Sequence, residues 1–363
     1  MCNNLGAGAR LHGQEVQVQI GIDSFVSTVT DPDTGVVVSP VERVHHLLEE
    51  IERADQVGLD TFGIGEHHRR EFMDSAPAVL LAAAAARTTS IRLSSAVTVL
   101  SAADPVRVFQ EFATVDLLSR GRVDLVVGRG SFVESFPLFG LDLADYDELF
   151  AEKLELLLRI RDQVEITWSG KHRPTLTGQG VYPRPLQDPL PIWVGVGGTP
   201  ASFVRAGMLG LPLMVAIIGG QPARFRPLID LYRTAGLRAG HAPDRLQVGL
   251  HCFGFVGETS RQAADDFYPG WAEMFSKVGR ERGFAPPDRT QFDAMCAPAG
   301  AYAIGDPETV AAKLLRINDE LGGISRISLQ MTNVRLAHGN LLRGIELLGT
   351  HVAPLVREAL AGA

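Results

Sequence analysis

Thr61-Phe-Gly-Ile-Gly-Glu-His-His-Arg69 is the stretch from which the fold and the site of this chain can best be inferred. Its apolar start predicts a short buried strand. Because strand side chains alternate between two faces, Phe62 and Ile64 share one face, whereas both glycines and His67 share the other. If the bulky face packs on helices, the glycine face borders a tight interior or a ligand.

Three ionisable residues, Glu66, His67 and His68, close this stretch. A histidine at the exit of a buried strand can exchange protons near neutral pH, which suits a catalytic role. Alternatively, the histidines only cap the strand or bond the loop backbone, as buried polar groups commonly do. The stretch alone leaves both interpretations open.

Length and composition indicate a globular protein with a sizeable core. The 363 residues are 45% hydrophobic and 21% charged, which suits two ordinary domains or one large α/β barrel with insertions. A net charge of −8 argues against nucleic acid or an anionic membrane as a main partner and favours a cytoplasmic protein. Cys2, Cys252 and Cys296 are widely spaced, so neither a disulfide framework nor a thiolate metal site is predicted.

The N-terminal residues lack the pattern of a secretory signal, and we expect residues 1–15 to form a flexible leader. No apolar run is long enough to span a bilayer; the longest smooth one, at 78–86, is too short.

Strand and helix patterns then alternate along the chain. Several helices are predicted to begin with a capping residue followed by proline, as in Ser39-Pro40, Asp104-Pro105, Thr199-Pro200 and Asp306-Pro307. Two segments interrupt the alternation, a loop or hairpin excursion at about 164–190 and a long mixed segment at about 258–304. The second is longer than one crossover helix requires, so we expect a mobile active-site segment there. Besides the opening stretch, strands are predicted at 16–25, 91–100, 122–127, 191–196, 212–218, 246–256 and 324–331.

Eight strands that are each followed by a helix predict a (β/α)8 TIM barrel, formed by one domain over residues 16–363. An open doubly wound sheet is the alternative, because spacing does not show closure. The first strand–helix junction lacks G-x-G-x-x-G, which disfavours a nicotinamide-binding Rossmann fold.

In a barrel, ligands gather at the carboxyl ends of the strands, and three further strand ends are unusual. Small residues at 94–98 either let a flat ligand approach or simply fit a crowded interior. Gly128-Arg129-Gly130 either offers a guanidinium and free N–H groups to a phosphate or forms a turn with an exposed arginine. The glycine-rich turn at 195–200 begins a helix, which favours an anion there.

Together these features resemble the bacterial luciferase-like family of flavin-dependent monooxygenases and oxidoreductases. The similarity spans most of residues 18–360 in the order and spacing of that family. The stretches that carry it are Glu66-His67-His68, Ser95-Ala96-Val97, Pro105-Val106-Arg107, the eight residues 116–123, Gly128-Arg129-Gly130, Phe139-Gly140 and Gly197-Gly198-Thr199.

The resemblance implies a luciferase-like barrel that binds FMN at its mouth. It assigns the catalytic histidine to His67, and the substrate pocket to His68 and Phe132. Arg129 and the turn 197–199 are expected on the flavin phosphate, and Ala96-Val97, where this family often has a cis peptide bond, behind the flavin ring. The full set of cofactor-binding residues implied is Glu66, Ser95, Ala96, Val97, Arg129, Ser131, Gly197, Gly198 and Thr199.

The activity implied by the resemblance is that of an FMN-dependent monooxygenase. Reduced FMN from a separate flavin reductase would react with O2, and a small organic substrate would be oxidised. The resemblance also implies a homodimer. The alternative on the same barrel is an F420-dependent oxidoreductase that transfers hydride. A metal-dependent hydrolase that uses Glu66, His67 and His68, or a non-catalytic flavin-storage protein, would be less consistent with these residues.

Overall fold

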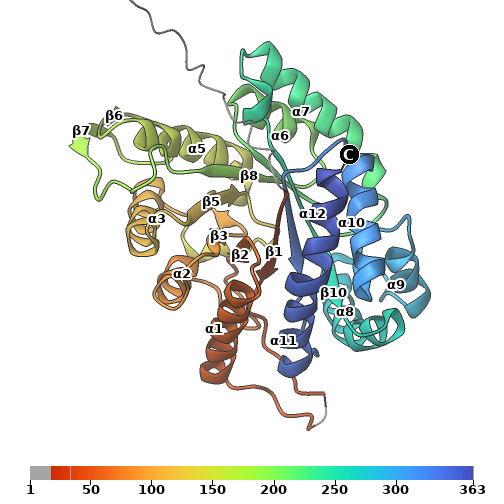
Figure 1. Cartoon of the computed structure of the whole chain (residues 1–363). Coiled ribbons are helices and arrows are strands. Elements are labelled where there is room, and N and C mark those ends of the chain that lie inside the picture. Colours follow the sequence, from red (N-terminus) through yellow and green to blue (C-terminus); the bar gives the residue numbers. More distant parts are fainter. Residues whose placement is uncertain (1–17, 33, 363) are drawn as a thin grey trace, which may run out of the picture.

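The computed structural model describes residues 18–32 and 34–362; the leader predicted at 1–15 lies outside these ranges. Eight parallel strands form a closed barrel in the order β1, β2, β3, β5, β8, β9, β10 and β12. β12 (Arg326–Gln330) returns to pair with β1 (Gln19–Ser24), so that Ile20 lies opposite Ile327. The helices surround the barrel, as Figure 1 shows. The predicted barrel is confirmed, and closure of the sheet excludes the open alternative.

The remaining barrel strands are short and almost entirely buried. They are β2 (Thr61–Ile64), β3 (Arg92–Ser95), β5 (Val123–Gly128), β8 (Ile192–Val196), β9 (Leu213–Ala216) and β10 (Val248–Val256). The main surrounding helices are α1 (Pro40–Gln56), α2 (Pro77–Ala85), α3 (Pro105–Ser119), α5 (Tyr146–Asp162), α6 (Pro200–Met208), α7 (Arg226–Arg238) and α10 (Pro307–Leu321).

Three of the four predicted caps accept a hydrogen bond from the first turn of their helix. Ser39 Oγ accepts from the Glu42 N–H at 3.2 Å, Asp104 Oδ1 from the Val106 N–H at 2.9 Å, and Asp306 Oδ1 from the Thr309 N–H. These bonds fix where α1, α3 and α10 begin. Thr199 precedes α6 but its side chain makes no cap bond, so that helix start differs from the others.

Charged residues fill the barrel interior toward the amino ends of its strands. Asp124 of β5 accepts from Arg92 Nη2 and from Arg326 Nη2, each at 2.6 Å. Burial alone would raise the pKa of Asp124, but the guanidinium groups of Arg326 and Arg92 lower it below its usual value. Trp193 of β8 stacks on Arg326 at 4.3 Å. This network closes that end, so a ligand has to approach from the carboxyl ends of the strands.

The two excursions have secondary structure of their own. The first contains an antiparallel hairpin of β6 (Glu165–Trp168) and β7 (Leu176–Gly180). The second contains α8 (Ser260–Arg282), α9 (Arg289–Cys296) and β11 (Ala303–Gly305), and its mobility stays a prediction.

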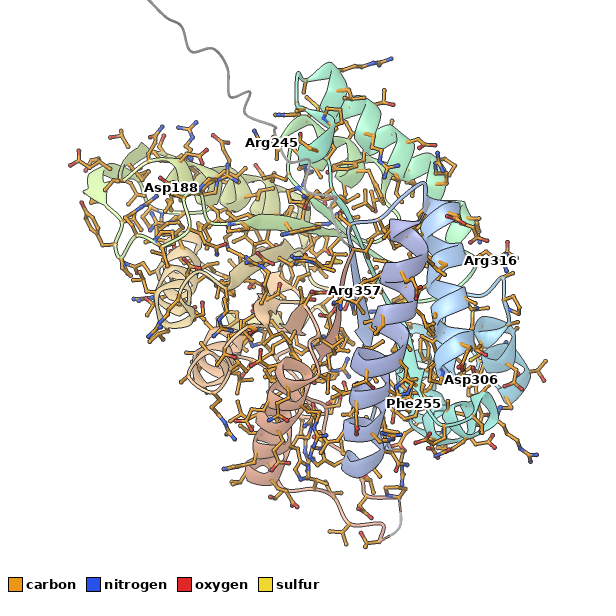
Figure 2. All side chains as sticks on the ribbon, viewed as in Figure 1. Asp188, Arg245, Phe255, Asp306, Arg316 and Arg357 are labelled. Atoms are coloured by element: carbon orange, nitrogen blue, oxygen red, sulfur yellow. The ribbon has the colours of Figure 1, made fainter. Side chains whose placement is uncertain are left out.

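The helix that follows the last barrel strand is divided by a π-helical turn. α11 (His338–Leu347) continues through Leu348–Val352 into α12 (Ala353–Ala361). Arg357 of α12, labelled in Figure 2, pairs with Asp60 at 2.6 Å and ties the end of the chain to the start of β2. Within the two described ranges, no helix combines the length and apolarity needed to cross a bilayer.

Candidate active site at the barrel mouth

His67 leaves the end of β2 and is held by a buried carboxylate. Asp74 Oδ2 lies 2.8 Å from His67 Nδ1, and Asp74 Oδ1 accepts the His67 backbone N–H at 3.1 Å. Asp74 is fully buried, and burial raises the pKa of its carboxyl. His67 is only 9% exposed, and its Nε2 has no hydrogen-bond partner among the described residues. Asp74 therefore fixes the orientation of the His67 ring through Nδ1, and Nε2 is left open to a ligand.

Aromatic rings surround the imidazole of His67. The ring centroids of Phe25, Phe72 and Phe132 lie 4.7, 4.4 and 5.4 Å from it. A β-carbon on Gly65 would lie 2.7 Å from Phe25 Cδ1 and 2.8 Å from Asp74 Oδ2. Gly65 is thus required for this packing, and the glycine face of the opening stretch does border a tight interior.

A second histidine–carboxylate pair lies inside the barrel. His251 Nδ1 of β10 is 2.7 Å from Asp23 Oδ2 of β1, while Asp23 Oδ1 accepts from Ser328 Oγ of β12 at 2.8 Å. Because β12 separates β10 from β1, this bond has to run across the concave face of the sheet. Phe25 stacks on His251, with centroids 6.0 Å apart, and also contacts His67.

Sequence reasoning missed Asp74, Asp23 and His251. A signal for the second pair did exist, since an aspartate near the end of one apolar strand and a histidine within another are unusual in a buried barrel. Pairing across an intervening strand, however, is set by closure of the sheet, which the sequence pattern does not specify.

Small residues line the mouth along β2, β3, β5 and β8. Gly63 leaves room for Asp23 and Ala96, because its β-carbon would overlap Asp23 Oδ1 and lie 2.9 Å from Ala96 Cβ. Gly128 and Gly195 lie against Val97, where added β-carbons would each be 2.7 Å from a Val97 methyl group.

Between Ala96 and Val97 the peptide bond is cis, as the family resemblance implied. The strand predicted at 91–100 is two pieces, β3 and the two-residue β4 (Thr98–Val99).

The side chains of Ser95, Glu66 and His68 are also bonded within the protein. Ser95 Oγ donates to the Val126 carbonyl at 2.8 Å and accepts the Val126 N–H, which joins β3 to β5. Glu66 accepts the Val99 N–H at 2.9 Å and lies 3.1 Å from His68 Nε2. His68 is thus paired with Glu66 while His67 is paired with Asp74, so the three ionisable residues do not converge on one metal ion.

Arg129 and the start of α6 meet at the same end of the barrel. Arg129 Nη2 lies 3.4 Å from Ser202 Oγ in the first turn of α6, and its guanidinium stacks over Tyr146. Arg129 also pairs with Asp147, whose side chain is 72% exposed. Ser202 is a further residue that sequence reasoning missed.

The turn between β8 and α6 is open to a ligand. Added β-carbons on Gly197 and Gly198 would meet no atom within 4 Å. Thr199 makes no cap bond, so its hydroxyl is not held by the helix. Pro200 has no N–H and the Ser202 N–H donates to the Thr199 carbonyl at 3.0 Å, which leaves the Ala201 N–H at the start of α6. These groups and Arg129 are suited to an anion.

The segment after β5 covers the histidine site and is held by α8. Arg69 stacks over Phe132 at 4.7 Å and pairs with Glu134 at 3.2 Å and with Glu281. Arg282 donates to the Ser131 carbonyl at 2.9 Å.

Two surface hollows of about 610 and 570 Å³, between α5 and the β6–β7 hairpin and along residues 133–143, are lined by neither His67 nor His251. The buried histidine–carboxylate pairs and the strand ends mark the candidate site, because neither hollow contains such a pair.

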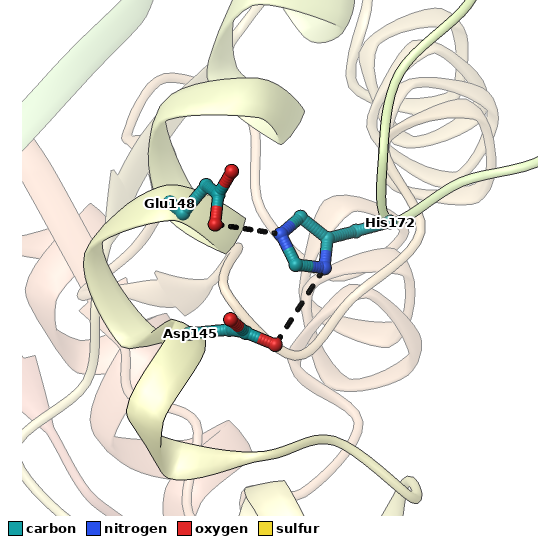
Figure 3. Close-up of side chains that lie close together, drawn as sticks. All are labelled: Asp145, Glu148 and His172. Carbon is teal, nitrogen blue, oxygen red and sulfur yellow. Dashed lines mark ion pairs between the residues drawn. The ribbon is translucent and has the colours of Figure 1, made fainter.

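One cluster of three possible metal ligands occurs in the described part of the chain: Asp145, Glu148 and His172 (Figure 3). Lys171 Nζ already lies 2.7 Å from Glu148 Oε2 and 3.6 Å from Asp145 Oδ1. The Lys171 ammonium group therefore neutralises these carboxylates, and the cluster is a surface ion-pair network.

Comparisons with known proteins identify relatives of this chain. The family model described as luciferase-like monooxygenase matches residues 22–323. The chain is 26% identical over 334 residues to 4-hydroxyprotoasukamycin monooxygenase of Streptomyces nodosus subsp. asukaensis, covering 87% of each chain. It is 29% identical over 196 residues to protein y4vJ of Sinorhizobium fredii and spans only 55% of that relative.

Solved structures show the same fold. Monooxygenase RslO1 from Streptomyces bottropensis matches with a TM-score of 0.80 at 24% identity, over 93% of this chain and 99% of the other. The oxygenating constituent of 3,6-diketocamphane monooxygenase from Pseudomonas putida, in complex with FMN, matches at 0.73 and 19% identity, over 93% and 98%. An F420-dependent secondary alcohol dehydrogenase matches at 0.72 and 20% identity, over 94% and 99%. With the family model covering most of the barrel, the chain belongs to the luciferase-like monooxygenase family.

Proposed function

We propose that this protein is an FMN-dependent monooxygenase that oxidises a small organic substrate with O2. The observation that carries the proposal is that one short segment serves two sites. The segment after β5 brings Arg129 to the start of α6 and Phe132 to the ring of His67. A ligand with a phosphate at one end and a flat ring at the other would therefore contact both.

The phosphate end of FMN fits the residues present. Its oxygens would accept from the Arg129 guanidinium, the Ala201 N–H at the start of α6 and the hydroxyl groups of Thr199 and Ser202. Asp147 is no obstacle, because an exposed ion pair contributes little and can be replaced by a phosphate.

The ring end fits the small residues of the mouth. A flat ring would lie over the Ala96-Val97 peptide, which the glycines of β2, β5 and β8 allow to pack closely against these strands. Reduced flavin, when bound, supplies the electrons that activate O2. The part of this chain is to hold the ring, to exclude water with Phe72 and Phe132, and to move a proton at His67 Nε2, with Asp74 fixing the imidazole.

An F420-dependent oxidoreductase is the second candidate, because the F420-dependent alcohol dehydrogenase has the same fold. F420 would transfer hydride, and His67 would guide a proton of the substrate. A separate flavin reductase, a homodimer and a cytoplasmic location belong to the first proposal as expectations from the family.

Titrating the purified protein with FMN and with F420, followed by absorption and fluorescence, separates the candidates. We expect FMN to bind and O2-dependent product formation to require added flavin reductase. Binding of F420 alone would support the second candidate. Binding of neither cofactor would refute both, and turnover unchanged in His67→Gln would refute the role of His67.

A further inference from the structure

Two histidines, not one, reach the barrel mouth with a carboxylate behind them. His251 is 7% exposed and Asp23 5%, so the second pair is as well shielded from water as the first. Both imidazole rings contact Phe25. The distance between the two imidazole centroids therefore cannot exceed the sum of their centroid distances to Phe25. The role proposed above uses only His67, which leaves the second pair without a function.

The hydrogen bonds of the second pair define which nitrogen of His251 is reactive. An ionised carboxylate only accepts hydrogen bonds. Asp23 accepts from Ser328 through Oδ1 and from His251 through Oδ2. In the neutral ring the proton is therefore on Nδ1, and Nε2 carries a free lone pair. No described residue donates to that lone pair.

A second polar group beside this pair also lacks a partner. Gln330 is 2% exposed and lies opposite Asp23 in the β1–β12 register, so its side chain points to the same face. Its amide makes no hydrogen bond with any described residue, and its oxygen and nitrogen are not among the fully enclosed unpartnered atoms, so they are accessible to a ligand. The two unpartnered groups indicate a ligand that carries its own donor and acceptor.

We propose that Asp23–His251 is a second proton-transfer pair, which accepts a proton from an O–H or N–H group of the bound organic molecule. The O–H or N–H bond breaks, the Nε2–H bond forms, and the resulting imidazolium faces Asp23. Gln330 hydrogen-bonds the anion left behind. The inference rests on the proposed function, since the molecule bound there would be the substrate that is oxidised.

Para-nitrophenol is a suitable probe, because its ionised form absorbs visible light and its O–H is acidic. At a pH below that of its own ionisation, we expect the wild-type protein to bind it as the phenolate, with the visible band appearing on mixing. His251→Gln should lose the band, and Gln330→Leu should weaken binding while the bound probe remains ionised. His45→Gln, on the exposed side of α1, is the matched control and should behave as wild type.

A measurement without a ligand tests the same pair. Nitrogen chemical shifts of His251 should show the Nδ1-protonated tautomer in the wild type and a tautomer mixture in Asp23→Asn. The Nε2-protonated tautomer, a phenolate band that survives His251→Gln, or no binding of the probe by the wild type would each overturn the inference. Failure of the proposed function appears separately, as absence of FMN and F420 binding in the titration above.

Discussion

Gly63→Ala tests how tightly the second pair is packed. The new methyl group would overlap Asp23 Oδ1 and lie 2.9 Å from Ala96 Cβ, so Asp23 has to move. Movement breaks the 2.8 Å bond from Ser328 and tilts His251. Overpacking of a core costs about 1–3 kcal/mol, and loss of a buried hydrogen bond about 1–3 kcal/mol. The reduced entropy of the unfolded chain returns at most about 1 kcal/mol. The expected net loss of stability is therefore about 1–5 kcal/mol.

The assay is thermal unfolding of Gly63→Ala and of a matched glycine variant. Gly197→Ala adds a methyl group that meets nothing within 4 Å, so its midpoint should stay near that of the wild type. Midpoints are the appropriate quantity, because a chain of this length need not unfold in one step.

A double variant identifies the cause of the loss. In an Asp23→Ala background, Gly63→Ala should cost less, because the overlapping oxygen is gone. A midpoint for Gly63→Ala equal to that of Gly197→Ala, or the same loss with and without Asp23, would refute the packing argument.

Three further perturbations have defined outcomes. Arg129→Gln should weaken FMN binding by about 10- to 100-fold in a fluorescence titration, because a charged hydrogen bond contributes about 1.5–3 kcal/mol. The control Arg224→Gln, at an exposed position, should leave FMN binding unchanged. Burial lowers the pKa of Lys313 to about 8, so between that pH and 10.5 the unfolded chain holds a proton that the folded chain has lost. The wild-type melting temperature should therefore rise relative to that of Lys313→Met across this range; parallel curves would contradict it. Because burial raises the pKa of Asp74 above 3.8, the wild-type fold should lose stability relative to Asp74→Asn as the pH rises through that pKa, and a constant difference in melting temperature would exclude this.

Local signals in the sequence predicted most of the fold. The caps at Ser39, Asp104 and Asp306 are formed as expected, because a side-chain oxygen and the N–H groups it accepts from are only a few residues apart. The strand predicted at 91–100 was too long, since alternation of side chains does not reveal where a strand divides. The residues expected to hold FMN or F420 stay predictions about binding, although the structure brings Arg129 to the start of α6.

Such local signals did not predict the contacts between distant segments. Asp74 follows His67 by seven residues, but a loop decides whether its carboxylate turns back to the ring. Asp23 and His251 are 228 residues apart and meet only because the strands close into a cylinder.

The sequence by itself determined the order of strands and helices, the inward face of the opening stretch and the histidine at its end. These features depend on the periodicity and on interactions between near neighbours. Only the tertiary structure decided which carboxylate stands behind each imidazole, and that two such pairs share one mouth. The physical reason is that strand alternation fixes the face on which a side chain lies, whereas sheet closure and register fix what lies opposite it.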